Sequence, residues 1–400
     1  MKRLPKLVST NKNMKPNKNK INNEILHVVT VSFVINHFFG NQFNYLRSKN
    51  GKNYHLACSS SKELHELSNT LKFIPFEVEI TRSINPLKDL KAIISIYKYI
   101  KKNNISTVIG HTPKGGLVAM TAAFLARTEE RIYFRHGIIY ETSTGFKRFL
   151  MKNIDRLTGF FAKKVVCVSN SVKQISERDR LNKASKNIVL GMGTCNGINT
   201  STKFNPDYKN KNQLDELRSK YNIRKDNVVG YIGRLVKDKG IDELILAWEI
   251  VNSKFPDSQL LLVGPIEERD SISSYSKKVI AENPSIIFID FVIDASPFFS
   301  LMNIFVLPTY REGFPTVALE ASSMELPVLI TKATGCTEAI IDNKTGIYIT
   351  YDVNDIAKKI IYYMENEEIA LEHGRQGRIF VNGNFEETKV WDLISAELKI

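Results

Sequence analysis

The chain has 400 residues, of which 43% are hydrophobic and 24% charged, a composition that supports two or three packed domains and excludes a disordered or collagen-like protein. The formal net charge of +14 is typical of proteins that bind nucleic acid, anionic lipid or phosphorylated ligands. Half of this charge lies in residues 1–20, which contain seven lysine or arginine residues and no acidic residue. We therefore expect a flexible basic leader over 1–23 and a body that is only mildly basic.

Cysteine and histidine spacing argues against a disulfide framework or a metal site. The four cysteines are scattered without any C-x-x-C pair, and the seven histidines are isolated from one another. We expect free buried thiols, a cytoplasmic location and no bound metal. The sequence also lacks both a stretch that resembles a signal peptide and the run of roughly 18 apolar residues that a membrane-spanning helix needs.

The first half of the chain alternates short hydrophobic runs with amphipathic patterns. Runs of β-branched and aromatic residues predict strands, and apolar residues spaced by three or four predict helices. The segment 25–39 is expected to begin as a buried strand and to run into a loop at 37–41. The other predicted elements are strands at 54–58, 106–110, 131–135 and 164–168, and helices at 86–102, 115–126 and 144–162.

The same alternation restarts after a polar segment at 199–212, which we interpret as an interdomain linker. Alternating strands and helices predict right-handed βαβ units and a parallel sheet. We therefore predict an α/β protein with two doubly wound, Rossmann-like domains, 24–203 joined by a final helix within 385–400, and 204–384, whose ligand-binding edges face each other across a cleft. The predicted elements here are strands at 227–232, 259–263, 285–290, 304–308, 327–330 and 346–349, and helices at 242–254, 316–324 and 390–400.

A loop with two cations follows the predicted strand 227–232. It contains Gly233-Arg234-Leu235 and then Lys239-Gly240. A glycine at a strand end lets a phosphate approach the backbone, an arginine forks onto phosphate oxygens, and a lysine adds a point charge. The spacing fits a diphosphate, although an ordinary solvated loop has the same residue types.

A second motif, at 311–316 (REGFPT), follows the predicted strand 304–308. Its glycine permits a tight turn into a helix whose N-terminal amides can bind an anion. Glu312 and Glu320 are eight residues apart, with this turn between them. Carboxylates repel a phosphate, but they accept hydrogen bonds from sugar hydroxyls. A sugar attached to the phosphate would therefore explain two carboxylates beside an anion-binding site. An exposed glutamate at a helix start is the alternative interpretation.

Together with 260–264 (LLLVG), these motifs resemble the retaining glycosyltransferases of the GT4 type, which have the GT-B fold; the resemblance covers most of 225–350. It implies that Arg234 and Lys239 hold the diphosphate of a nucleotide sugar and that Glu320 binds its ribose. It also implies that Glu312 and the backbone of 313–315 contact the donor sugar, and that 290–293 lies against the base. The implied donor-binding residues are Gly233, Arg234, Lys239, Gly264, Phe291, Val292, Glu312, Gly313, Phe314, Pro315, Thr316 and Glu320.

The N-terminal half resembles a narrower group, the bacterial transferases that build capsule, O-antigen or other glycan chains on undecaprenyl diphosphate. The matching segments are 111–114 (HTPK), 135–137 (RHG), 144–146 (TGF), 167–171 (CVSNS) and 196–199 (NGIN). The resemblance implies that His136 positions the donor sugar or its developing charge, a structural turn histidine being the alternative. The implied catalytic residues are His136, Glu312, Arg234 and Lys239, and the implied acceptor-binding residues are Gly40, Asn41, His111 and Lys114.

This resemblance implies a retaining transfer of an N-acetylated hexosamine or a deoxyhexosamine from a UDP-linked donor to a lipid-diphosphate-linked saccharide in surface polysaccharide synthesis. Departure of the nucleoside diphosphate builds negative charge, which the cations and helix amides stabilise, while the sugar becomes oxocarbenium-like. Similar enzymes usually need no metal, and no Asp-x-Asp occurs in the chain. We therefore expect a hexosyltransferase without metal or cofactor. A soluble, glycolipid or protein acceptor is the alternative.

The predicted helix at 144–164 is both basic and aromatic. Such a helix can lie on an anionic bilayer, so we expect peripheral contact with the inner face of the cell membrane. A core-facing helix with a solvated basic face is the alternative. Its apolar residues are Phe146, Phe149, Leu150, Ile154, Leu157, Phe160 and Phe161, and its basic residues are Lys147, Arg148, Lys152, Arg156, Lys163 and Lys164.

Other functional classes make different demands on the sequence. A nucleic-acid-binding protein would contain a recognisable binding module, and a dinucleotide oxidoreductase would carry G-x-G-x-x-G after an early strand. Neither pattern is present, so we expect no nucleic-acid partner. A basic membrane- or nucleic-acid-binding protein without catalysis, and a sugar-nucleotide epimerase of the same fold, are the further alternatives.

Overall fold

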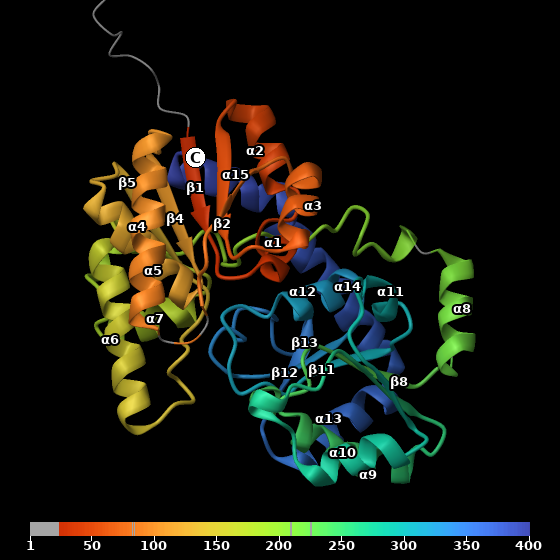
Figure 1. The fold of residues 1–400 in the computed structure, drawn as a ribbon. Helices are drawn as coiled ribbons and strands as arrows, with labels where there is room; N and C mark the ends of the chain where they lie inside the picture. Colours follow the sequence, from red (N-terminus) through yellow and green to blue (C-terminus); the bar gives the residue numbers. More distant parts are fainter. Residues whose placement is uncertain (1–23, 82, 84, 209, 225) are drawn as a thin grey trace, which may run out of the picture.

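In a computed structural model, the chain forms two α/β units that lie side by side (Figure 1). The structure describes residues 24–400 apart from 82, 84, 209 and 225, so the leader predicted over 1–23 lies outside the described residues. Each unit has a sheet of parallel strands with helices on its faces. The predicted fold class, two doubly wound α/β domains, is confirmed.

The first sheet has seven strands in the order β3-β2-β1-β4-β5-β6-β7, and every neighbouring pair is parallel. The chain enters at β1, builds outward to β3, and then crosses to β4 on the other side of β1. This reversal creates a crevice at the carboxyl ends of β1 and β4, the place where ligands of such sheets bind. The strands are β1 (Glu24–Val28), β2 (Asn53–Cys58), β3 (Ile74–Glu77), β4 (Thr107–His111), β5 (Glu130–Arg135), β6 (Lys164–Cys167) and β7 (Asn187–Ile188).

Helices cover both faces of this sheet and bury one hydrophobic core on each. The face covered by α4 and α5 is formed mainly by small and aliphatic residues, and the opposite face is rich in aromatic rings. The helices are α1 (Ile35–Phe39), α2 (Gln42–Asn50), α3 (Lys62–Leu71), α4 (Pro86–Lys102), α5 (Pro113–Leu125), α6 (Gly145–Phe161) and α7 (Asn170–Arg178).

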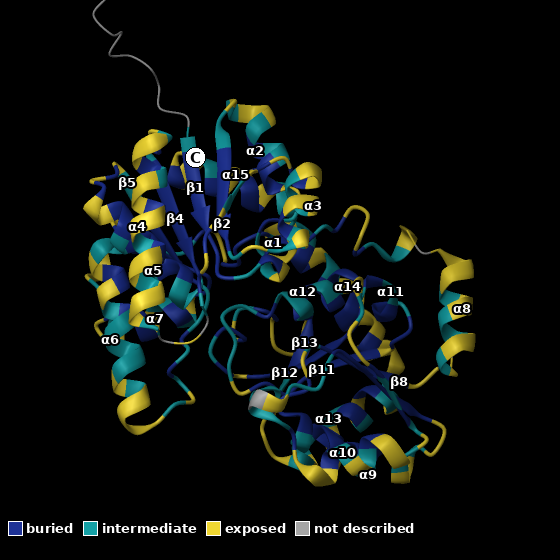
Figure 2. Cartoon of the chain, viewed as in Figure 1, coloured by how far each residue is buried: buried dark blue, intermediate teal, exposed yellow. Residues whose placement is uncertain are grey.

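The second sheet has six parallel strands in the order β10-β9-β8-β11-β12-β13, with its own reversal between β8 and β11. Both sheets are buried, whereas the outer faces of the helices are exposed (Figure 2). The strands are β8 (Val228–Ile232), β9 (Gln259–Val263), β10 (Ile286–Ile289), β11 (Ile304–Leu307), β12 (Val328–Thr331) and β13 (Gly346–Ile349). The helices are α8 (Lys211–Tyr221), α9 (Ile241–Lys254), α10 (Ser274–Glu282), α11 (Ser296–Phe299), α12 (Thr316–Ser323), α13 (Val353–Glu365) and α14 (Glu367–Asn384).

The last helix, α15 (Glu387–Leu398), returns to the first sheet and packs into its aromatic core. The crossing is tied by a parallel bridge between Ile198 and Glu386. Beyond it, Trp391 is buried and its indole Nε1 donates a hydrogen bond to Asn196 Oδ1 over 2.9 Å. The two segments that pass between the domains are therefore fixed to each other.

The segment 25–39 differs from the prediction. The strand ends at Val28, and the rest of the segment forms a short 3-10 turn and helix α1 instead of a loop. Ile35 and Phe39 on α1 are buried in the aromatic core. Tertiary burial of this aromatic run therefore selects a helix where composition favoured continued strand and loop.

Helix α4 has the predicted bounds, but its buried face coincides only in part with the apolar stripe that the sequence predicts for it, namely Leu90, Ile93, Ile94, Tyr97 and Ile100. Ala92, Ile96 and Ile100 are buried, whereas Leu90 and Ile94 are 54% and 44% exposed. Both sets of residues have helical spacing, so periodicity alone does not choose between them. The buried residues join the core that α4 shares with α5, so tertiary packing decides the face.

Candidate active site

The carboxyl-terminal edges of the two sheets meet at the junction between the domains. The turn after β5 contacts the loop after β11 so closely that a Cβ at Gly313 would overlap the carbonyl oxygen of His136. A second contact joins the N-terminus of α7 to the loop after β12, where Ser171 Oγ accepts a hydrogen bond from the amide of Gly335 over 2.8 Å. The motifs from both halves of the sequence therefore lie against one another.

The first cationic loop carries Arg234 and Lys239, and each pairs with a carboxylate. Arg234 donates to Glu267 across 2.8 Å, with both side chains substantially exposed. Lys239 forms an ion pair with Glu312, and here both side chains are mostly buried. Gly240 ends the loop and precedes the first residue of α9. Its backbone lies in the left-handed region (φ 69°), a conformation that would be strained for a residue with a side chain.

The basic and the acidic residue of the second loop both pair with residues of the first loop. Arg311 turns back onto Asp238, with Nη2 to Oδ2 at 2.7 Å. Glu312 is held at its backbone by the carbonyl of Thr334 (2.9 Å) and points to Lys239. Helix α12 begins directly afterwards at Thr316. The predicted diphosphate-binding lysine and the predicted sugar-binding glutamate are thus brought into contact.

Glu320 projects from α12 and is partly buried. Burial raises its pKa from the ordinary 4.5 to about 7, the charge of Asp294 acts in the same direction, and Lys203 opposes them. Lys203 is itself paired with Asp294 at 3.2 Å. A carboxylate at this position lacks full solvation, so it is well suited to accept hydrogen bonds from a ligand's hydroxyl groups.

The segment 290–293, predicted to lie against the base, follows β10, and Gly264, another predicted donor-binding residue, follows β9. Gly264 packs against the other donor loop so tightly that a Cβ there would overlap the carbonyl oxygen of Gly233. Phe291 is 71% exposed and Val292 is partly buried. An exposed aromatic ring beside a close backbone contact is available for stacking on a planar ligand.

His136 lies in the turn directly after β5. Its ring stacks on Phe38 with centroids 4.0 Å apart and planes 10° from parallel. Its Nε2 lies 3.0 Å from Nδ1 of His111. Burial lowers the pKa of His136 to about 3, so its imidazole is neutral at physiological pH.

The four residues predicted to bind the acceptor do not form one cluster. His111 is only 2% exposed, and its two ring nitrogens contact other histidines. Lys114 pairs with Asp89 of α4 at 2.5 Å and is mostly buried. Gly40 ends α1, and Asn41 accepts a hydrogen bond from Asn44. Their role toward an acceptor stays a prediction.

Several residues of the site escaped sequence reasoning. Glu267 and Asp238 pair with cations of the donor loops, and Glu338 reaches across to the N-terminus of α7, where its Oε1 accepts from the amide of Ser171 over 2.7 Å. The sequence did show that these acidic residues follow predicted strands, which could have marked them as candidates for the site. Their partners are distant in sequence, so the signal did not identify the pairings.

Comparison with known proteins agrees with this arrangement. The family model for glycosyl transferases group 1 matches residues 213–380, and the model for glycosyl transferase 4-like proteins matches residues 24–169. The capsular polysaccharide biosynthesis glycosyltransferase CapM of Staphylococcus aureus is 35% identical over 373 residues, which cover 93% of this chain and 95% of CapM. The chain belongs to the GT4-type glycosyltransferases. The resemblance inferred from the motifs is therefore confirmed.

Two further relatives have informative names. The N,N'-diacetylbacillosaminyl-diphospho-undecaprenol alpha-1,3-N-acetylgalactosaminyltransferase of Campylobacter jejuni is 26% identical over 307 residues, 75% of this chain and 78% of that protein. The crystal structure of Anabaena Alr3699/HepE in complex with UDP-glucose has a TM-score of 0.78 at 17% identity, covering 94% of this chain and 99% of that one. The second likeness supports the GT-B fold of this glycosyltransferase.

Proposed function

We propose that this glycosyltransferase moves an N-acetylated hexosamine or a deoxyhexosamine from a UDP-sugar to a lipid-diphosphate-linked saccharide, with retention of the anomeric configuration, in surface polysaccharide synthesis. The observation that carries the proposal is the contact between the two motifs: Lys239 pairs with Glu312, and Gly313 touches the turn that holds His136. The residues proposed to bind the diphosphate and the donor sugar and the turn that holds His136 thus lie at one junction.

The leaving group explains the cations. As the bond between the sugar C1 and the diphosphate oxygen breaks, negative charge builds on the phosphate. Arg234 and Lys239 supply two positive charges there, and the N-terminal amides of α12 add partial positive charge. Lys239 exchanges its carboxylate partner for a phosphate oxygen, and Glu312 becomes free to accept hydrogen bonds from the donor sugar. These charges replace a divalent metal in the proposal.

Retention follows if the acceptor attacks the face from which the diphosphate departs. The acceptor oxygen forms the new bond to C1, and its proton passes to the departing phosphate oxygen. The sugar is oxocarbenium-like between the two events. His136, held beside the loop of Glu312 and Gly313, orients the donor sugar.

The class of acceptor is supported by the relatives. The name of the Campylobacter enzyme describes a diphospho-undecaprenol acceptor and an N-acetylgalactosaminyl group, and that of CapM describes capsular polysaccharide synthesis. The Anabaena structure contains UDP-glucose. These names favour a UDP donor and a lipid-linked acceptor over a soluble one.

The proposal is tested by incubating the protein with a panel of UDP- and GDP-sugars and membrane lipid extract, with and without EDTA, and measuring nucleoside diphosphate release. We expect a UDP-sugar to be consumed in both conditions, and Arg234→Ala and Glu312→Ala to lose most of the activity. Arg375→Ala is the matched control, because Arg375 pairs with Glu372 on the exposed face of α14 at 2.9 Å. The proposal fails if no donor is consumed and neither variant alters nucleotide binding.

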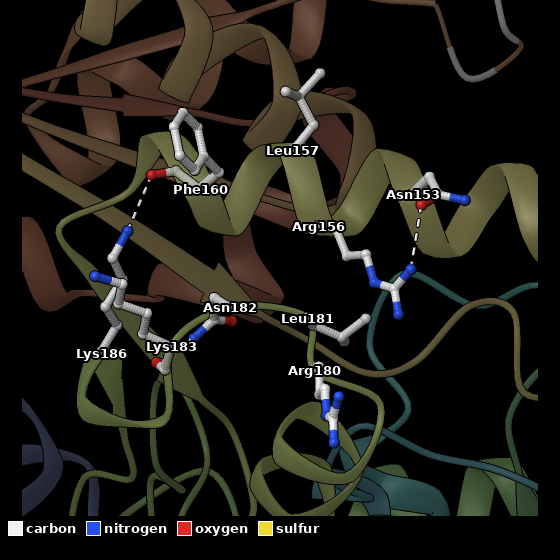
Figure 3. A pocket seen from close by; sticks show the side chains of 9 residues that line it. All are labelled: Asn153, Arg156, Leu157, Phe160, Arg180, Leu181, Asn182, Lys183 and Lys186. Atoms are coloured by element: carbon white, nitrogen blue, oxygen red, sulfur yellow. Dashed lines mark hydrogen bonds between the residues drawn. The ribbon is translucent and has the colours of Figure 1, made fainter.

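We also propose that the enzyme rests on an anionic membrane through α6. Phe146, Phe149 and Phe160 are 76%, 64% and 67% exposed on this helix. Beside its C-terminal half lies a hollow of about 510 Å³, lined by basic side chains together with Leu157 and Phe160 (Figure 3). Among the residues that the structure describes, no carboxylate lines this hollow. Its lining residues are Asn153, Arg156, Leu157, Phe160, Arg180, Leu181, Asn182, Lys183 and Lys186.

Two of these cations are free to meet lipid headgroups. Lys186 is occupied by backbone carbonyls at the end of α6, and Arg156 by Asn153 and a carbonyl. Arg180 and Lys183 are exposed and have no ion pair among the described residues. A basic residue near an anionic bilayer contributes about 1 kcal/mol, so the two together are worth about 2 kcal/mol, which is roughly a thirtyfold change in binding.

The membrane proposal is tested by sedimentation with phosphatidylglycerol or phosphatidylcholine vesicles. We expect binding to the anionic vesicles only, weakened about thirtyfold in the double variant Arg180→Ser, Lys183→Ser. The control removes the same charge from the other domain, as Lys344→Ser with Lys358→Ser, both exposed. Equal loss in both double variants would show that net charge, and not this surface, governs binding. Undiminished binding in both would contradict the proposal.

A further inference from the structure

Three histidines lie on or directly after three adjacent strands of the first sheet, β1, β4 and β5, and each lies nearer the carboxyl edge than the one before. The register pairs His27 of β1 with Ile109 of β4, and His111 at the end of β4 with Phe134 of β5. Each histidine is thus two residues nearer the carboxyl edge than the one before it, and the last, His136, follows β5. Since side chains alternate across a sheet, residues two apart share a face. The three rings form a ladder that ends at the domain junction.

Hydrogen bonds connect the ladder. His27 Nδ1 lies 3.1 Å from His111 Nε2, and His111 Nδ1 lies 3.0 Å from His136 Nε2. The first two rings are nearly parallel, with centroids 5.3 Å apart and planes 17° from parallel. His27 and His111 are each 2% exposed, and the rings of Phe38 and Phe39 pack around the ladder.

All three imidazoles are neutral. Burial lowers the pKa of His27 and of His136 to about 3, and burial together with the proximity of these two histidines lowers the pKa of His111 well below its ordinary value. A neutral imidazole carries one N–H and one lone pair. The two hydrogen bonds can therefore run in only two ways: donors all toward His136, or donors all toward His27.

The buried end of the ladder decides between them. His27 Nε2 is buried and has no hydrogen-bond partner among the described residues. Phe39 and Phe43 meet this ring edge to face. If each histidine donated toward His27, the ring of His27 would carry its proton on Nε2, and this N–H would have no partner. If each histidine donates toward His136, His27 Nε2 carries only an unfilled lone pair. Orphaned buried N–H groups are rarer than unfilled acceptors, so donation toward His136 is favoured.

From this geometry we infer that His111 and His27 are positioning residues that fix the tautomer of His136. His27 Nδ1–H donates to His111 Nε2, and His111 Nδ1–H donates to His136 Nε2. His136 consequently carries its proton on Nδ1, which has no hydrogen-bond partner among the described residues and is free to donate to the donor sugar. The last step rests on the proposed function, whereas the tautomer does not.

This assignment has a mechanistic consequence. With Nε2 accepting from His111 and Nδ1 protonated, His136 has no free lone pair. It can donate a hydrogen bond but cannot act as a general base toward the acceptor hydroxyl. The acceptor's proton must therefore leave by another route, which agrees with transfer to the departing phosphate oxygen.

The tautomer can be measured without knowing the substrate. In protein labelled with ring-¹⁵N histidine, long-range ¹H–¹⁵N correlation spectra distinguish protonated from bare ring nitrogens, and His136→Gln identifies the His136 signals. We expect a protonated Nδ1 and a bare Nε2 on His136, and a bare Nε2 on His27. A protonated Nε2 on His136 in the unaltered protein overturns the inference, even if transferase activity is intact.

Variants test the role of His111. His111→Leu removes the donor, so His136 should shift toward the Nε2-protonated form and kcat should fall about fivefold with little change in donor KM, the worth of one neutral hydrogen bond. His111→Asn should restore both, because the asparagine amide nitrogen takes the place of Nδ1. His27→Leu should have a smaller effect in the same direction. His373→Leu is the control, since it removes a buried histidine that contacts Tyr363 in the other domain. An unchanged His136 tautomer in folded His111→Leu contradicts the positioning role.

Discussion

The cations of the donor site already have partners in the protein alone. Lys239 pairs with Glu312 inside the junction, and Arg234 pairs with Glu267 near the surface. In the proposed mechanism, diphosphate binding exchanges one anionic partner for another instead of neutralising free charges. Such an exchange limits the affinity for the diphosphate, because part of the gain with phosphate is offset by the lost carboxylate contact.

Glu267 offers a test of this exchange. In Glu267→Gln, Arg234 loses its competing carboxylate, so we expect nucleoside diphosphate to bind about threefold more tightly, in keeping with the worth of an exposed ion pair. Isothermal titration calorimetry measures the change. Glu372→Gln frees Arg375 in the same way far from the site and should leave binding unchanged. Weaker binding in Glu267→Gln would instead assign Glu267 to nucleotide contact.

Glu320 should make stability depend on pH. Its pKa is raised from 4.5 to about 7 in the folded protein, so the folded state holds this proton more tightly than the unfolded chain. Its contribution to stability is therefore present at low pH and is lost as the pH rises through about 7. We expect Glu320→Gln to gain stability relative to the unaltered protein at pH 8 but not at pH 4.5, in urea unfolding. Equal differences at the two pH values would contradict the raised pKa.

At the scale of elements, α6 is anchored on one side by a buried ion pair and open on the other. Arg135, at the end of β5, is completely buried and donates to Asp155 of α6 over 3.0 Å, with Asn182 as a further acceptor. This network fixes the rotation of the helix about its axis. Phe146, Phe149 and Phe160 consequently face outward. The aromatic, basic surface proposed to meet lipid thus depends on a polar contact underneath it.

Breaking that pair should be costly. Asp155→Asn leaves the buried guanidinium of Arg135 without a counter-charge, and we expect a loss of about 3–5 kcal/mol in the free energy of unfolding. Glu372→Gln breaks a pair of similar length, 2.9 Å, whose side chains are exposed, and should cost less than about 1 kcal/mol. Urea titration compares the two. Similar costs would show that the Arg135 network contributes little beyond a surface pair.

At the scale of the whole molecule, a few contacts hold the domains together at the junction. Glu338 accepts from the backbone and hydroxyl of Ser171 at 2.7 and 3.1 Å, and Thr334 donates to Glu141 at 2.5 Å. The carboxylate lies at the N-terminus of α7, where the helix dipole favours negative charge. These contacts join the first domain to the loop after β12 in the second.

Removing Glu338 should loosen these contacts. In Glu338→Ala we expect the domains to separate on average, and the radius of gyration in small-angle X-ray scattering to increase. Glu365→Ala serves as control, because Glu365 pairs with Lys254 within the second domain. Donor binding provides a second readout, since a site built from both domains should bind more weakly when they part. An unchanged radius in Glu338→Ala would show that the remaining junction contacts suffice.

Local pattern anticipated the elements better than their orientation. The strand and helix alternation and the bounds of α4 followed from the sequence, yet two residues of the apolar stripe predicted for that helix, Leu90 and Ile94, are exposed, whereas Ile100 is buried. In the same way, the aromatic run after Val28 formed α1 because a core formed by α2 and α15 buries it. In both cases the deciding contacts are made with other elements of the fold, and for α1 they include α15, near the other end of the chain.

The candidate site, too, was predictable from the sequence only in part. Sequence by itself determined the α/β class, the family and the two donor loops, because glycine turns, strand ends and cation spacing act over a few residues. Only the tertiary structure decided which acids meet Arg234 and Lys239, and that His27, His111 and His136 form one ladder. Those contacts depend on strand order and register, which bring together residues 25 to 84 positions apart. No local pattern encodes that distance.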